Sequence, residues 1–398
     1  MKKFLSIILI ASLILTIGIT ACAAGSPTVT EEKIPVMMGL ITLHDENSTY
    51  DKNFIEAFKN VCEARNVHYL IKTGVGENSE AYEAAADLAD AGCNIVFADS
   101  FGHEDYLMQA AREFPEVQFC HATGTKAHTA DIPNYHNAFA AIYEGRFLNG
   151  VALGMKLNEI VAATGAEPKV GYVGAYSYAE VISGYNSFFL GVRSVCPEAT
   201  MTVTFTGSWY DETAEKEAAY TLIDQGCVVI SAHADSMGMP TACEQLGIPF
   251  VGYNGSFKES CPTTYVASTR INWEPYFNYL VTAYRRNEVI DTDWTGTIET
   301  GSVEMCELNM DVAASGTDKA LENLKNEFVN GRLKVYDTST FTVNGEVLTS
   351  YLADVDTDAA YTPDTEVVSN GYFHESEYRS APYFDLNVDG ISLLNIAF

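Results

Sequence analysis

Aromatic and hydrogen-bonding side chains follow most of the short apolar runs in this sequence, at the points where strands of a sheet would end. The run "NIVFA" is followed by Asp99, Ser100 and Phe101, and the run "VQFC" by His121 and Thr123. Ligands of open parallel sheets bind outside the carboxyl ends of the strands. We therefore expect these side chains to line a binding site.

The second half of the chain repeats this arrangement with its own aromatic, acidic and amide residues. Apolar runs there are followed by Tyr176, Tyr178 and Glu180, by Trp209 and Tyr210, by His233 and Asp235, and by Asn254. Near the start of the chain, the run "LITL" precedes His44, Asp45 and Tyr50 in the same way. The two halves thus offer two sets of similar side chains to one ligand.

A planar ring of low charge would suit this composition. Stacking of a nucleobase on an aromatic side chain is worth about 1 to 3 kcal/mol. Two such faces and a few hydrogen bonds could reach the roughly 8 kcal/mol of a micromolar complex. An aliphatic amino acid or a free phosphate would instead favour cationic residues, and these strand ends contain none.

Four histidines at or near strand ends leave a metal site open as an alternative: His44, His103, His121 and His233. Imidazole and carboxylate groups together can bind zinc. However, these histidines are dispersed along the chain without an HxxxH or HxH motif, so ordinary hydrogen-bonded histidines are the preferred interpretation and no metal is assigned. The sequence also lacks a GxSxG motif and a phosphate-binding loop. We therefore expect no catalytic residues and no enzyme.

The elements that must position these residues alternate between short apolar runs and longer amphipathic ones. Strands and helices in strict turn predict parallel sheets covered on both faces. The alternation restarts after a helical stretch near residues 142–157. We predict an α/β fold of two doubly wound parallel-sheet lobes joined by a hinge, at residues 34–145 and 146–272. Residues 273–398 should form a return segment and an irregular C-terminal extension that packs on the lobes, with short β-like runs and many turns.

Composition and charge narrow the possible partners. The chain has 398 residues, enough for two domains, with 53 acidic and 23 basic residues. This balance argues against nucleic acid or an anionic membrane surface as the partner. Eight cysteines lie beyond residue 22, mostly within apolar runs and without CxxC spacing, so we expect most of them to be small buried side chains.

The amino terminus has the pattern of an export signal. Two lysines precede an apolar stretch at residues 4–19, which is too short and wrongly flanked for a membrane-spanning helix. This stretch ends in "ITAC", which resembles a bacterial lipobox, so Cys22 would carry lipid after cleavage; a plain secretory signal is the alternative. Residues 1–21 are the predicted lipoprotein signal peptide, and residues 22–33 a flexible tether.

The chain resembles the basic membrane protein (BMP) family of substrate-binding lipoproteins, which is related to the purine nucleoside receptors of ABC importers. Four segments carry the resemblance over about residues 36–273: "VFADSFGHEDYLMQAAREFPEVQFCHATG", "YEGRFLNGVALGMK", "KVGYVGAY" and "VISGYNSFFLGVRSVCPEA". The resemblance implies a periplasmic-binding-protein type I-like fold, in which two α/β lobes joined by crossing strands close over the ligand. It implies no cofactor.

The resemblance also implies roles for individual residues. Tyr50 corresponds to a family aromatic that stacks on the purine, and Trp209 to a second aromatic on the other lobe. Ser100, Phe101 and His121 correspond to residues that line the cleft.

Two positions depart from the pattern of nucleoside-binding relatives, where an aspartate and a lysine hold the ribose. This sequence has Asn254 and Ile271 there, and Asp235 is a candidate for the missing carboxylate. A free nucleobase or a different heterocycle is therefore as credible a ligand as a nucleoside. The predicted ligand-binding residues are Tyr50, Asp51, Ser100, Phe101, His121, Tyr178, Trp209, Asp235 and Asn254.

Together these features predict a receptor that is anchored by lipid on the extracytoplasmic face of the cell membrane. It would bind a purine nucleoside or nucleobase between its lobes and present it to an ABC permease. Two alternatives remain: a sensor lipoprotein that docks on a membrane signalling partner, and a metal-dependent hydrolase built on the histidines.

Overall fold

The structure is a computed structural model that describes residues 34–355 and 362–396. The predicted signal peptide, Cys22 with its predicted lipid and the predicted tether lie outside these residues. No helix in the described part of the chain is both long enough and apolar enough to span a membrane.

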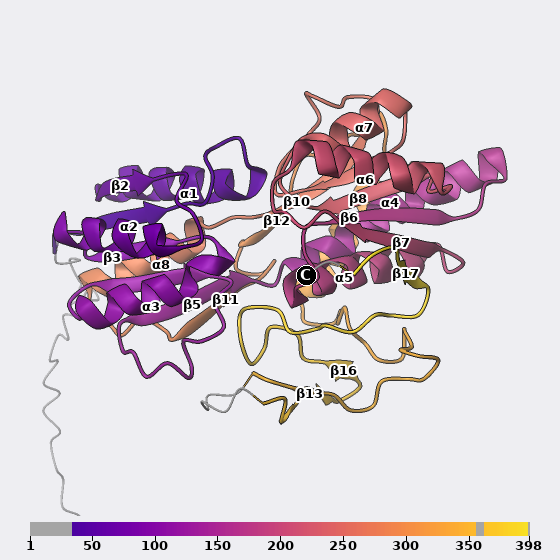
Figure 1. Ribbon diagram of the computed structural model, residues 1–398. Helices are drawn as coiled ribbons and strands as arrows, with labels where there is room; N and C mark the ends of the chain where they lie inside the picture. Colours follow the sequence, from indigo (N-terminus) through magenta and orange to yellow (C-terminus); the bar gives the residue numbers. More distant parts are fainter. Residues whose placement is uncertain (1–33, 356–361, 397–398) are drawn as a thin grey trace, which may run out of the picture.

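The first lobe is built on a six-stranded parallel sheet (Figure 1). In spatial order its strands are β11 (Asp293–Gly296), β5 (Tyr135–Ala140), β4 (Gln118–Ala122), β3 (Ile95–Ala98), β1 (Met37–Ile41) and β2 (His68–Lys72). The helices α1 (Thr49–Arg65) and α8 (Glu274–Arg285) pack against each other on one face, and α2 (Ser79–Asp90) and α3 (Glu104–Glu113) pack together on the other. A short 3₁₀ helix, η1 (Phe101–His103), leads from β3 into α3.

The second lobe repeats the plan with a seven-stranded sheet. Its order is β12 (Val303–Met305), β10 (Tyr265–Ile271), β9 (Phe250–Tyr253), β8 (Val229–His233), β6 (Lys169–Gly174), β7 (Thr200–Phe205) and β17 (Ile391–Leu393). Only β12 runs antiparallel to its neighbour. The helices α4 (Ile142–Thr164) and α5 (Ala179–Val195) cover one face, and α6 (Glu212–Asp224) and α7 (Gly238–Leu246) cover the other.

Strand order fixes where a ligand can bind. In the first sheet the chain starts at β1, moves outward to β2 and returns to the other side of β1 at β3; in the second sheet β6, β7 and β8 do the same. Such a reversal leaves a crevice at the carboxyl ends of the two strands that flank it. The predicted fold of two doubly wound lobes is therefore confirmed.

Three crossings join the lobes and form the hinge. The chain passes from β5 to α4 at Ala141, from β10 to α8 at residues 272–273, and from β11 to β12 at residues 297–302. Backbone hydrogen bonds tie the crossings to one another, from Ala141 N to Gly296 O (2.7 Å) and from Asn272 N to Ser302 O (2.8 Å). The three crossings are thus linked to one another by backbone hydrogen bonds.

Several elements differ from the sequence-based expectations. Strands β5 and β10 were not among the predicted strands, because polar residues interrupt their apolar pattern; His136 and Asn137 of β5 are buried through hydrogen bonds. The prediction of short β-like runs and many turns for the C-terminal part of the chain did not include a helix. A regular helix, α9 (Thr317–Val329), lies there and packs on α4.

The C-terminal extension, residues 330–355 and 362–396, is mostly irregular, as predicted, and packs chiefly on α5 (Figure 1). Its regular pieces are the short pairs β13 (Leu352–Ala353) with β14 (Thr365–Glu366) and β15 (Val368–Ser369) with β16 (Tyr372–Phe373), and the edge strand β17. Asn186 of α5 binds both Leu386 O (2.8 Å) and Val388 N (2.9 Å) of the extension. The eight described cysteines are free thiols and seven are buried, which confirms the expectation from their apolar surroundings.

Candidate functional site

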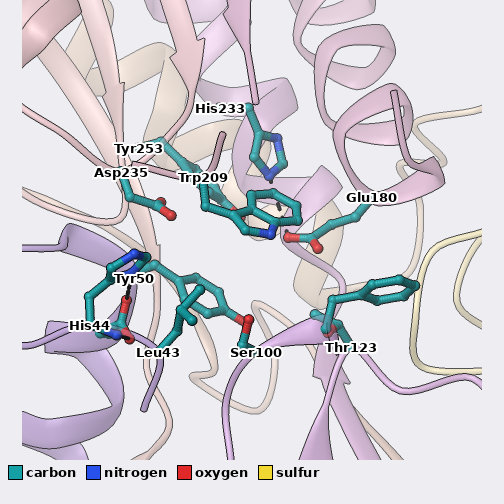
Figure 2. A pocket seen from close by; sticks show the side chains of 12 residues that line it. Leu43, His44, Tyr50, Ser100, Thr123, Glu180, Trp209, His233, Asp235 and Tyr253 are labelled. Atoms are coloured by element: carbon teal, nitrogen blue, oxygen red, sulfur yellow. Dashed lines mark hydrogen bonds and ion pairs between the residues drawn. The ribbon is translucent and has the colours of Figure 1, made fainter. Parts of the chain in front are cut away.

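A cavity lies between the lobes, at the ends of strands from both sheets (Figure 2). The first lobe contributes Leu43, His44, Tyr50, Asp51, Ser100, Phe101 and Thr123, and the second contributes Glu180, Trp209, His233, Asp235 and Tyr253. The cavity volume is about 20 Å³, enough for one water molecule. A larger guest therefore requires that the lobes and the lining side chains move apart.

Direct contacts show that the two lobes meet across this cavity. Thr49 N donates to Asp235 O (3.2 Å), and Asn53 Nδ2 donates to Asn254 O (2.8 Å). The structure therefore represents a closed arrangement of the lobes.

Tyr50 is fixed on the wall of the first lobe. It lies in the first turn of α1, which Ser48 caps through its side chain. The Tyr50 hydroxyl donates to Asp99 O (2.9 Å), and its ring packs edge-on against Phe54 at 4.9 Å. Burial and the nearby Glu180 carboxylate raise the pKa of Tyr50, so the ring stays neutral. The ring is thus held in place before any ligand arrives.

Asp51, the next residue in the chain, forms hydrogen bonds with residues of its own lobe. Its carboxylate accepts hydrogen bonds from His44 N (2.7 Å), from the His44 ring (3.3 Å) and from Ser48 Oγ (2.5 Å). Burial alone would raise the pKa of Asp51, but these hydrogen bonds outweigh it and lower the pKa. Asp51 therefore holds the loop before α1 in place and has little capacity left for a ligand.

Trp209 forms the opposing wall on the second lobe, in the loop after β7. Its ring contacts Tyr176 at 5.1 Å and Tyr178 at 6.0 Å between centroids. Its backbone oxygen accepts a hydrogen bond from Asp235 N (3.0 Å). Figure 2 shows the indole of Trp209 and the phenol of Tyr50 pointing into the cavity from opposite sides.

Acidic groups dominate the charge of the cavity. Asp51, Glu180 and Asp235 line it, and none of its described lining residues is Lys or Arg. Burial, together with the neighbouring carboxylates of Asp51, Glu215 and Glu180, raises the pKa of Asp235 well above its ordinary value. Such a cavity favours ligands that offer N–H or O–H donors and disfavours anions.

His233 and Tyr253 complete the second wall. Burial lowers the pKa of His233, whose Nε2 lies 3.4 Å from Glu180 Oε1. Behind them, the fully buried Arg146 donates to Gly252 O (3.1 Å), and its guanidinium lies 5.3 Å from the Tyr253 ring. Arg146 supports this wall and does not line the cavity.

The structure brings six of the nine predicted ligand-binding residues into one cavity: Tyr50, Asp51, Ser100, Phe101, Trp209 and Asp235. The other three lie elsewhere. His121 binds Ser100 O through Nε2 (2.7 Å), and its ring is behind the cavity wall. Tyr178 lines an adjoining cavity, and Asn254 is buried beside the site without lining it.

The cavity also contains residues outside the predicted set: Leu43, His44, Thr123, Glu180, His233 and Tyr253. Four of these residues, His44, Thr123, Glu180 and His233, follow predicted strand ends in the sequence. Their position could therefore have identified them as candidates for the site. Tyr253 ends β9, whereas Asn254 follows it with a left-handed φ of 60°, a change of direction that the sequence does not show. Here Tyr253 lines the cavity.

The histidines proposed for a metal site have separate partners. His103 binds Val75 O (3.0 Å), His121 binds Ser100 O, and His44 and His233 face the different carboxylates Asp51 and Glu180. Within residues 34–355 and 362–396, no three His, Cys, Asp or Glu side chains gather where they could hold a metal ion.

Comparison with protein families identifies this type of site. Residues 39–339 match the Bmp family, described as ABC transporter substrate-binding protein PnrA-like. The chain belongs to this family. The family is one of substrate-binding proteins of ABC transporters and not of enzymes.

Individual relatives of this Bmp-family protein differ in what they are named for. The chain is 34% identical over 220 residues to a purine-binding protein of Brucella abortus. The matched segment covers 55% of this chain and 58% of the relative. It is 29% identical over 264 residues to a "Putative ABC transporter glucose-binding protein" of Haloferax volcanii, covering 66% and 64%. The chain thus spans less than two thirds of either relative.

A solved structure supports the fold. An ABC transporter solute-binding protein from Conexibacter woesei superimposes with a TM-score of 0.62 at 19% identity, covering 75% of this chain and 98% of that one. At this identity the match concerns the fold alone.

Proposed function

We propose that this Bmp-family protein captures a purine nucleobase or nucleoside between Tyr50 and Trp209 and delivers it to an ABC permease. Lipid on Cys22 would hold it at the extracytoplasmic face of the cell membrane. The observation that carries the proposal is the pair of aromatic side chains, one from each lobe, that line a single cavity with three carboxylates and no described Lys or Arg.

The chemistry of a purine matches this lining. Its flat ring can stack on both aromatic side chains, and its N–H groups, or the hydroxyls of a ribose, can donate to Asp235 and Glu180. A nucleotide fits poorly, because its phosphate would approach carboxylates without a cation to balance them. The 34% identity to a purine-binding protein supports the same ligand class.

Closure of the lobes would follow from binding. Tyr50 and Trp209 belong to different lobes, so a ligand contacts both only when the lobes have closed around it, with the two walls further apart than in this structure. A ligand that binds the closed form better than the open form shifts the population toward it by a hinge rotation.

A sugar is the competing ligand, because the chain is also 29% identical to a relative named for glucose binding. Thermal-shift measurements and calorimetry with adenine, guanine, adenosine, inosine and glucose would separate the two. We expect a purine to raise the melting temperature in a concentration-dependent way, as preferential binding to the folded state requires. Stabilisation by glucose alone would contradict the proposal.

The proposed membrane anchor has its own test. Mass spectrometry of the mature protein should find a lipid on an amino-terminal Cys22, and Cys22→Ser should lose this modification without changing the affinity for purine. An unmodified Cys22 at the amino terminus of the wild-type protein would refute anchoring through Cys22.

A further inference from the structure

A second cavity adjoins the candidate site and shares its wall. It has a volume of about 240 Å³, and Phe101, Thr123 and Glu180 line both spaces. Thr125, Tyr178 and Ala179 complete its sides from the two lobes, and Arg379, Ala381 and Pro382 of the C-terminal extension close it.

Aromatic rings connect the two spaces. Trp209 of the first cavity contacts Tyr178 of the second at 6.0 Å, and Tyr178 lies 5.3 Å from Phe101, which belongs to both. Phe101 and Tyr178 come from opposite lobes, so this aromatic contact forms only where the lobes meet. An apolar group attached to a ring in the first cavity would therefore remain in contact with aromatic surface.

Thr123, at the junction of the two cavities, has an unusual backbone conformation. Its φ of 62° lies in the left-handed region, which a β-branched residue rarely adopts. Strained residues of this kind persist where the surrounding structure enforces them, and they cluster at ligand sites. The conformation places Thr123 on the wall that both cavities share.

The wall from the C-terminal extension is anchored on both lobes. Ser380 N donates to Asp293 Oδ2 of the first lobe (3.0 Å), and Asn387 accepts from the Tyr185 hydroxyl of the second (2.5 Å). Arg379 donates to the backbone oxygens of Asp354 (3.0 Å), Ala381 (3.3 Å) and Pro382 (3.3 Å). Its charge is thus engaged by the extension, and the cavity offers mostly apolar surface. The residues of this wall lie beyond the family match, which ends at residue 339.

We propose that this second cavity is a subsite for an uncharged alkyl or aryl substituent of the ligand, so that the natural ligand is a substituted purine. The proposal rests on the proposed function. An apolar cavity of about 150 Å³ can bind benzene, so the space here admits a phenyl group. Because the C-terminal extension lies beyond the family match, we expect this subsite to be particular to this chain, in addition to the first cavity, where the purine ring would bind.

Calorimetry with adenine and 6-benzylaminopurine tests the subsite. We expect the wild-type protein to bind 6-benzylaminopurine about tenfold to a hundredfold more tightly, as burial of an aryl group predicts. In Ala179→Phe, the new ring would fill the subsite, and the ratio of the two affinities should fall to about one. Ala179 begins α5 and is half-buried.

A matched control is Ala214→Phe, also a half-buried alanine in the first turn of a helix, α6, which lines neither cavity. It should keep the wild-type ratio. If Ala179→Phe does not fold by circular dichroism, Thr125→Phe fills the subsite from the opposite lobe.

The outcomes separate the two proposals. If wild-type protein binds adenine as tightly as 6-benzylaminopurine, or if both filling variants keep the wild-type preference, the subsite is refuted while purine binding stands. If neither compound binds and glucose does, the proposed function fails, and the subsite proposal fails with it.

Discussion

The two walls of the cleft each present a buried aspartate to the same cavity, and the two aspartates behave differently. Asp51 is 1% exposed and Asp235 is 5% exposed. Yet hydrogen bonds from His44 and Ser48 overcome burial and lower the pKa of Asp51, whereas burial and neighbouring carboxylates raise the pKa of Asp235. Burial is common to both, so the local donors decide the outcome.

This difference separates a structural group from a ligand-binding group. The donors to Asp51 come from its own lobe and are present in either arrangement of the lobes. Asp235 instead faces further acidic groups, so a ligand N–H or O–H would relieve an unfavourable environment. We therefore expect substitutions of Asp51 to affect folding and substitutions of Asp235 to affect binding.

The largest effect should come from Asp51→Ala. Removal of the buried carboxylate leaves His44 N, the His44 ring and Ser48 Oγ without this acceptor, so the free energy of unfolding should fall by about 3 kcal/mol. Urea unfolding of the ligand-free protein measures this change. Asp45→Ala is the control, since Asp45 also accepts hydrogen bonds in this loop but is exposed, and it should cost less than about 1 kcal/mol. Equal decreases in the free energy of unfolding for the two variants would contradict the structural role of Asp51.

Trp209→Ala should weaken purine binding by about 1 to 3 kcal/mol, because one stacking face is lost. Calorimetry measures the affinity. Trp294→Ala is a matched control: Trp294 is also half-buried but lies in β11, away from both cavities, so its loss should lower stability without lowering affinity. A Trp209→Ala protein with wild-type affinity would mean that the second lobe does not stack on the ligand.

Asp235→Asn should reduce purine affinity about tenfold, because an amide offers one acceptor oxygen where the carboxyl group offers two. The free energy of unfolding of the ligand-free protein at pH 7 should stay the same or rise, since the amide does not meet the unfavourable acidic surroundings of the carboxyl group. A loss of stability as large as that of Asp51→Ala would contradict the contrast between the two walls.

The pH dependence of stability should have opposite signs for the two aspartates. Because folding raises the pKa of Asp235, the contribution of Asp235 to the free energy of unfolding falls as the pH rises above about 3.9, the pKa of an aspartate in the unfolded chain. The stability of Asp235→Asn relative to wild type should therefore increase from pH 4 to pH 7. The wild-type protein should have a higher free energy of unfolding than Asp51→Asn, and this difference should be fully present above about pH 4. The difference should disappear as the pH falls through the lowered pKa of Asp51. Urea unfolding across pH 3 to 7 checks both slopes.

The smallest effect is expected for Tyr50→Phe. It removes the hydrogen bond to Asp99 O and keeps the ring, so stability should fall by about 1 kcal/mol and purine affinity should change less than about twofold. Tyr50→Ala should lower affinity as much as Trp209→Ala. If Tyr50→Phe alone abolishes binding, the hydroxyl and not the ring contacts the ligand.

The fold could be predicted from the sequence because strand and helix patterns are local. Apolar runs such as "NIVFA" and amphipathic segments such as α2 need only their own residues to be recognised. Strand β5 was missed because its buried His136 and Asn137 are satisfied by Gln118 and by backbone groups that are distant in sequence. The helix α9 shows the opposite error, since a charged amphipathic segment was taken for turns.

The sequence by itself determined which residues follow the strand ends, and this was enough to bring Tyr50, Phe101 and Trp209 to one cavity. Only the tertiary structure decided which of their neighbours face that cavity. Adjacent positions such as Tyr253 and Asn254 point to different sides, and the donors around Asp51 and Asp235 depend on how loops fold and lobes meet. Residue type sets the chemistry that a side chain can perform, whereas contacts between distant segments set its direction and its charge.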